Sequence, residues 1–172
     1  MSFLARFLGN QSKSNTASEP RSMQPLLTAL SELEPERARY LAAFAYVMSR
    51  VAAADRIIDP AEVDQMRRSL IDEGGLPADQ AEIVVSLATA EAKEYGGSQD
   101  YVITRRLAEL TPKEERPRVL QCAISIAAAD QTIDGHEEHE LRKIARQLGF
   151  TDAQFLKSLN RFRDLRSVLQ AD

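Results

Sequence analysis

The sequence predicts an all-α protein, and three observations lead to that prediction. The 172 residues are 44% hydrophobic and 28% charged, which is the composition of an ordinary globular domain. Ala, Leu, Glu, Arg and Gln, which all favour helices, dominate the chain. From Pro25 onwards, apolar residues recur at helical spacing, and no segment shows the strict alternation of a strand.

A duplicated phrase predicts how these helices are organised. Residues 52–62 read AAADRIIDPAE, and residues 127–137 read AAADQTIDGHE. Similarity repeated along one chain indicates repeated structural units. We therefore expect one helical domain over residues 25–170, made of the repeats 25–97 and 98–170 and related by a pseudo-twofold axis.

The chain before this domain has a different character. Residues 1–8 form a short amphipathic segment, and residues 9–24 are mostly small and polar, as in a flexible linker. Eight residues are too few for a stable isolated helix. Two interpretations stay open for the first segment: a loosely docked terminus, or a tab that docks on a partner or a membrane surface.

Four helices are expected in each repeat. In the first repeat they cover residues 25–33, 35–54, 60–73 and 78–95. The second of these is apolar on most of its circumference, which predicts a central position. Gly74 and Gly75 end the helix 60–73, as glycines commonly do.

The second repeat follows the same plan, with helices at 99–110, 113–129, 135–148 and 152–165. Thr111, Pro112 and Glu114 have the spacing of an N-cap, a first-turn proline and a capping-box acid. Pro117 lies inside this helix, so either its start is irregular or regular helix begins there. Gly149 ends the third helix, and Thr151 and Gln154 cap the fourth.

The alanine runs 52–54 and 127–129 predict a contact between the long helices of the two repeats. Alanine adds almost no bulk, so two helices that carry it can approach at the short end of the usual ~8–10 Å range. We expect the helices 36–54 and 113–129 to cross antiparallel near the pseudo-twofold axis.

Several functional classes are disfavoured by composition. The net charge of −4 argues against a nucleic-acid binder, which usually carries a basic face. No segment approaches the ~20 apolar residues of a transmembrane helix, and the N-terminus lacks the features of a signal peptide. The lone Cys122 lies in an apolar run and is interpreted as a buried residue of a reducing compartment. No catalytic constellation is visible, so we expect a cytoplasmic protein that is not an enzyme.

The two acidic turns have a structural interpretation and a functional one. Asp59 with Glu62, and Asp134 with Glu137, have the spacing of helix-starting caps. Asp55 and Asp130 instead follow alanine runs at the ends of apolar helices, where a negative charge opposes the helix dipole. Either turn donors or a bound cation would offset that cost.

The functional interpretation is a divalent-cation site. Asp55, Asp59 and Glu62 would form one set of ligands, Asp130, Asp134 and Glu137 a second set, or both sets would act jointly. Ligands that are all oxygen suit Ca²⁺ or Mg²⁺.

Two alternative metal sites fit less well. The second turn begins like an EF-hand, but Leu141 stands where the closing Glu is required, and the first turn lacks the glycine. His136 and His139 share a helix face, yet no third His or Cys stands nearby to complete a zinc site.

The doubled AAAD…ID…E pattern, together with IARQLGF at residues 144–150, resembles the TerB family of tellurite-resistance proteins. The resemblance covers residues 25–170. It implies an all-α fold of two repeats around two central antiparallel helices, and an acidic surface that binds divalent cations. It also implies a stress response with protein partners at the inner face of the membrane. The acidic positions carried over are Asp55, Asp59, Glu62, Asp130, Asp134, Glu137, Glu138 and Glu140.

The halves differ next to the first aspartate of each turn. The family often has glycine there, whereas Arg56 and Gln131 occupy the position here. Because Arg56 would neutralise the first cluster, we expect the second turn to be the stronger site. We thus expect a non-enzymatic protein that binds Ca²⁺, Mg²⁺ or a protein partner. The alternative is an interaction module without metal, in which the acids only cap helices.

Overall fold

The structure is a computed structural model that describes residues 24–52, 60–94, 100–130 and 132–165. Across these residues it contains eight α-helices, two short 3₁₀ segments and no strand. The prediction of an all-α fold is confirmed. The amphipathic segment 1–8 and most of the predicted linker lie outside the described residues.

The helices follow the predicted plan closely. Those of the first half are α2 (Gln24–Ser31), α3 (Pro35–Ala52), α4 (Pro60–Asp72) and α5 (Ala78–Glu94). Those of the second half are α6 (Asp100–Leu110), α7 (Arg116–Ala127), α8 (Gly135–Gln147) and α9 (Asp152–Leu159). The 3₁₀ segments η4 (Ala128–Asp130) and η5 (Asn160–Leu165) follow α7 and α9.

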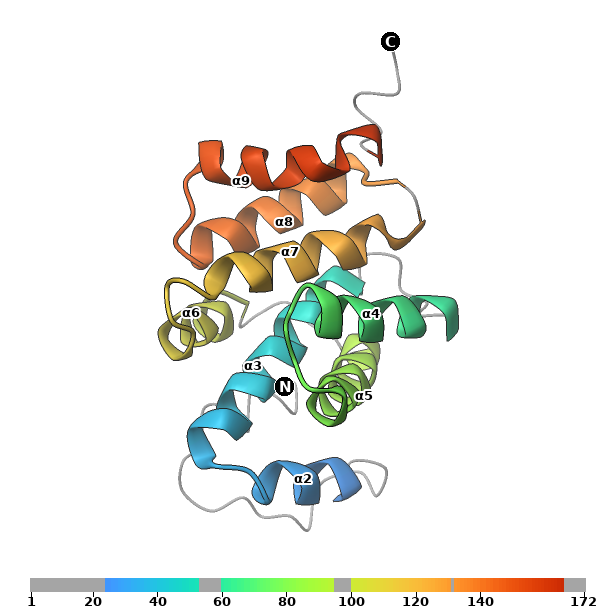
Figure 1. The fold of residues 1–172 in the computed structure, drawn as a ribbon, viewed down its shortest axis with the longest axis vertical. Coiled ribbons are helices and arrows are strands. Elements are labelled where there is room, and N and C mark those ends of the chain that lie inside the picture. The colour runs from blue at the N-terminus through green and yellow to red at the C-terminus, as the bar shows by residue number, and fades with distance from the viewer. Residues whose placement is uncertain (1–23, 53–59, 95–99, 131, 166–172) are drawn as a thin grey trace.

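Helix α3 is central, as its apolar circumference predicts. Every residue from Tyr40 to Val51 is buried, and the helix contacts α5, α6, α7 and α8. In Figure 1, α3 runs through the middle of the molecule, with α7, α8 and α9 stacked towards one end and α2 at the other. The core is therefore organised around one helix of the first half.

Helices of the two halves pack against each other. Helix α4 packs on α7, and α8 packs on α3. At the first contact, the Oγ atoms of Ser69 and Ser125 lie 2.9 Å apart. At the second contact, Arg50 of α3 binds Glu140 of α8. This packing is what a pseudo-twofold relation would produce, although that relation stays a prediction.

The direction in which α3 and α7 cross differs from the antiparallel expectation. Val51 and Ala52 at the end of α3 line the same pocket as Ile126 and Ala127 at the end of α7. In Figure 1 the two helices run in the same general sense, not in opposite senses. The alanines do lie at this meeting point, but small side chains set only how closely helices approach and not their relative direction.

The start of α7 also differs from the predicted cap. The Thr111 hydroxyl donates to the Leu107 carbonyl at 2.6 Å instead of capping a following helix. Residues 112–115 form a turn, and regular helix begins at Arg116, with Pro117 in its first turn. A proline cannot donate the backbone hydrogen bond that would join the turn to the helix. The alternative that helix begins at Pro117 is therefore the correct one, to within one residue.

The predicted ends of α4 and α8 are confirmed. Gly75 and Gly149 have φ angles of 68° and 94°, a region that side chains with a Cβ atom rarely occupy. The cap of α9 is confirmed as well, because Thr151 and Gln154 form a reciprocal capping box. The predicted α-helix to residue 165 is too long: α9 ends at Leu159 and continues as 3₁₀ turns.

No helix within the described part of the chain combines the length and the apolar character needed to cross a membrane.

Candidate functional site

The second acidic turn begins helix α8. One carboxylate oxygen of Asp134 accepts the backbone N–H of Glu137 at 2.8 Å. One carboxylate oxygen of Glu137 accepts the backbone N–H of Asp134, also at 2.8 Å. This reciprocal capping box satisfies two backbone donors that a helix start otherwise leaves without a partner. The helix-starting interpretation of these two acids is confirmed.

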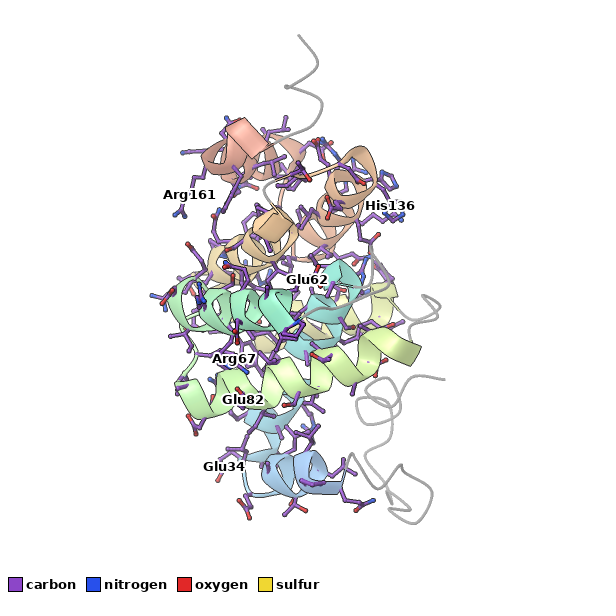
Figure 2. All side chains as sticks on the ribbon, turned by 90° about the vertical axis from the view of Figure 1, so that its right-hand side faces the viewer. Glu34, Glu62, Arg67, Glu82, His136 and Arg161 are labelled. Carbon is purple, nitrogen blue, oxygen red and sulfur yellow. The ribbon has the colours of Figure 1, made fainter. Side chains whose placement is uncertain are left out.

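A small pocket of about 30 Å³ lies where the two halves meet. Its lining consists of Val51, Ala52, Glu62, Met66, Ile126, Ala127, Ala129 and Glu137. It contains one glutamate from the first turn of α4 and one from the first turn of α8. In Figure 2, Glu62 lies at the level where α4 meets the end of α3, while His136 lies on the outer side of the α8 start. The structure thus brings together one predicted ligand from each acidic turn.

The pocket lies among helix ends of both signs, since Glu62 and Glu137 come from helix starts. It receives the C-terminal ends of α3 and α7, through Ala52 and Ala127. The last carbonyl groups of a helix have no partner within the helix and carry the negative end of its dipole. Glu137 is only 8% exposed, so its charge acts in a partly desolvated place. Two glutamates from helix starts and the C-terminal ends of two helices therefore adjoin one small volume.

Two other predicted ligands are engaged elsewhere. Glu138 accepts a hydrogen bond from Arg142 at 2.9 Å, one turn further along α8. Glu140 accepts a hydrogen bond from Arg50 at 2.9 Å and one from Lys143 at 3.4 Å. Burial raises the pKa of Glu140, but the positive charges of Arg50 and Lys143 outweigh burial and leave that pKa below its ordinary value. Glu140 is held as an anion by its own ion pairs.

Three predicted ligands are not described by the structure. Asp55 and Asp59 lie outside the described residues. Asp130 closes the 3₁₀ segment η4, but the position of its side chain is also outside the description. In the sequence, Asp130 directly follows Ala129, which lines the pocket.

The zinc alternative gains nothing from the structure. His136 and His139 are both exposed on the first turns of α8. In the part of the chain that is described, no three His, Cys, Asp or Glu side chains are placed to hold a metal ion together. Cys122 is fully buried, and burial raises the pKa of its thiol, as expected for a residue that packs in the core.

Sequence reasoning missed two residues at or beside the pocket. Met66 lines it from α4, although its position predicts only a core residue. Arg50 lies next to the pocket-lining Val51 and is 2% exposed. The signal for Arg50 was present, because it is the one charged residue between Tyr40 and Val51. A charge inside a buried helix requires a partner of opposite charge.

Fold and site together define an all-helical domain with a duplicated acidic turn, in which one acid of each turn faces a shared pocket. The model of the TerB family, described as tellurite resistance protein TerB, matches residues 40–159. This match covers more than half of the chain, so the protein belongs to the TerB family. No curated protein and no solved structure gave a match.

Proposed function

We propose that this TerB family member binds one divalent cation, Ca²⁺ or Mg²⁺, in the pocket between its halves and is not an enzyme. The observation that carries the proposal is the placement of Glu62 and Glu137 on opposite halves but around one pocket. Carboxylate and carbonyl oxygens are the ligands that these hard cations take. The pocket volume of about 30 Å³ exceeds the ~10–15 Å³ that one water molecule needs, so the pocket has room for a single small ion.

Further ligands would come from the residues that adjoin the pocket in sequence. Asp130 directly follows the pocket residue Ala129, and Asp55 stands three residues after the pocket residue Ala52. Glu138 and Glu140 are excluded from the proposed ligand set because Arg142 and Arg50 bind them. A bound cation would join the first turns of α4 and α8, and this would present the domain in one fixed form to protein partners of a stress response near the membrane.

The experiment is calorimetric titration of metal-stripped protein with Ca²⁺ and with Mg²⁺. Glu62→Gln and Glu137→Gln each remove one charge, and glutamine at position 137 can still complete the capping box. We expect one ion per chain in the wild type and an affinity at least about tenfold lower in each variant. Glu82→Gln is the matched control, because Glu82 pairs with Arg67 on the outer side of α4 and α5. The absence of heat at millimolar metal, or equal affinity in Glu62→Gln and wild type, would refute the cation proposal.

The alternative is an interaction module in which the acids only begin helices. The complete capping box of Asp134 and Glu137 supports this alternative, since it gives both residues a structural role. In that case the segment 1–8 would dock on a partner or a membrane. Deletion of residues 1–22 should then abolish co-sedimentation with anionic vesicles and leave the thermal midpoint unchanged, whereas unchanged sedimentation would count against it.

A further inference from the structure

Arg50 is a buried charge that the proposed cation site does not use. It lies in the last turns of α3 with 2% of its surface exposed. Taking a guanidinium out of water costs several kcal/mol unless a carboxylate and further acceptors replace the water. The partners that compensate this cost show what the residue holds together.

The guanidinium group connects three helices. Its Nε atom donates to Glu140 of α8 at 2.9 Å, and Nη2 donates to the same carboxylate oxygen. Its Nη1 atom donates to the hydroxyl of Thr104 on α6 at 2.6 Å and to the amide oxygen of Gln147 on α8 at 3.0 Å. All three nitrogens of the planar group are used, a geometry that the point charge of a lysine cannot reproduce.

These contacts lie close in sequence to pocket residues of both α3 and α8. Val51 and Ala52, which follow Arg50 directly, form one wall. On α8, Glu140 stands three residues after Glu137, and residues with that spacing share a helix face. Arg50 therefore binds α8 about one turn after Glu137, which also lines the pocket.

We infer that Arg50 is a positioning residue for Glu137: its bonds to Glu140 and Gln147 fix the register of α8 on α3 and so place the Glu137 carboxylate at the pocket. The placement of Glu137 by Arg50 is inferred from the contacts alone. Its effect on cation affinity rests on the proposed function. Arg50 also keeps Glu140 from acting as a competing ligand. Outer partners that orient a ligand typically change metal affinity by about 10–100-fold when they are removed.

The test uses Arg50→Lys, Arg50→Met and Glu140→Gln in the full chain, with two measurements. The first is hydrogen exchange at the Glu137 amide in metal-free protein, compared with the Gln154 amide, which makes the same kind of cap on α9. The second is the affinity for Ca²⁺. We expect Arg50→Met to raise exchange at Glu137 roughly tenfold more than at Gln154, and to weaken Ca²⁺ binding about tenfold. Arg50→Lys should show both effects, faster exchange at Glu137 and weaker Ca²⁺ binding, but to a smaller extent.

Ser69→Ala is the matched control, because it removes a buried polar contact between α4 and α7 without touching α8. It should leave unchanged both the ratio of hydrogen-exchange rates at the Glu137 and Gln154 amides and the affinity for Ca²⁺. If Arg50→Met does not fold, Glu140→Gln, which keeps an acceptor for Arg50, gives the same readings in milder form. Equal acceleration at Glu137 and Gln154 would overturn the inference, as would selective acceleration with unchanged Ca²⁺ affinity. If the wild type binds no cation, the proposed function fails, and the exchange ratio alone decides whether Arg50 positions Glu137.

Discussion

Asp134 allows the role of an acid as a helix cap to be separated from its role as a charge. Its carboxylate accepts the Glu137 N–H at 2.8 Å and begins α8. Asparagine caps helices as well as aspartate does, but it carries no charge, whereas alanine removes both the acceptor and the charge. Asp134→Asn therefore changes one property, the charge, and Asp134→Ala changes two, the charge and the hydrogen-bond acceptor.

The expected magnitudes follow from this geometry. Loss of the cap in Asp134→Ala should lower the free energy of unfolding by about 1 kcal/mol. Loss of the favourable charge at the helix N-terminus adds about 0.3–1 kcal/mol, and Asp134→Asn should show only this second loss. For a chain of this size, 1 kcal/mol corresponds to a shift of roughly 2–4 °C in the thermal midpoint.

The assay is chemical and thermal unfolding followed by circular dichroism at neutral pH without metal. Thr151→Ala provides a comparison, because it removes the corresponding cap of α9 at a place far from the pocket. Equal losses in Asp134→Asn and Asp134→Ala would refute the reasoning, since the cap would then contribute nothing beyond charge. An Asp134→Ala variant that is as stable as the wild type would refute the capping box itself. If calcium stabilises the wild type but not Asp134→Asn, the charge also contributes to cation binding.

Two further predictions concern the backbone and the pH dependence. Gly149→Ala should cost about 1–2 kcal/mol in denaturant unfolding, because φ is 94° there. Gly135→Ala, with no atom within 4 Å of the added Cβ, should be neutral or slightly stabilising, and equal losses in both would contradict this. Because the pKa of Glu140 is lowered on folding, its contribution to stability is complete at neutral pH and is lost as the pH falls through the folded-state pKa. The difference in unfolding free energy between wild type and Glu140→Gln should therefore narrow below about pH 4.5, and a constant difference from pH 7 to pH 3 would show that the ion pair does not contribute.

Most of the fold was predictable because local signals agreed with one another. The apolar circumference of α3, the positive-φ positions Gly75 and Gly149, and the cap at Thr151 all depend on residues close in sequence. The start of α7 was not predictable from the sequence, because Thr111 could cap the helix that follows it or bond back to the helix before it. In the structure Thr111 bonds back to Leu107, and regular helix begins at Arg116, next to Pro117.

The site was predictable only in part, for a similar reason. The duplicated phrase puts Glu62 and Glu137 at matching positions of the sequence, and both line the pocket. It could not show that Glu140 is bound by Arg50, because that contact joins residues 90 positions apart. Nor did it show the direction of α7 relative to α3, which depends on how whole helix faces pack.

The burial of α3 has a consequence for how the chain is made and folded. Its contacts with α6, α7 and α8 all come from residues that the ribosome adds after α5 is complete. Until then the face of α3 that holds Arg50 lacks the cover of these three helices, and exposed apolar surfaces bind chaperones or aggregate. We therefore expect that the first repeat does not fold by itself, and that a chain cut between α5 and α6 gives a first half that folds only when the second is supplied.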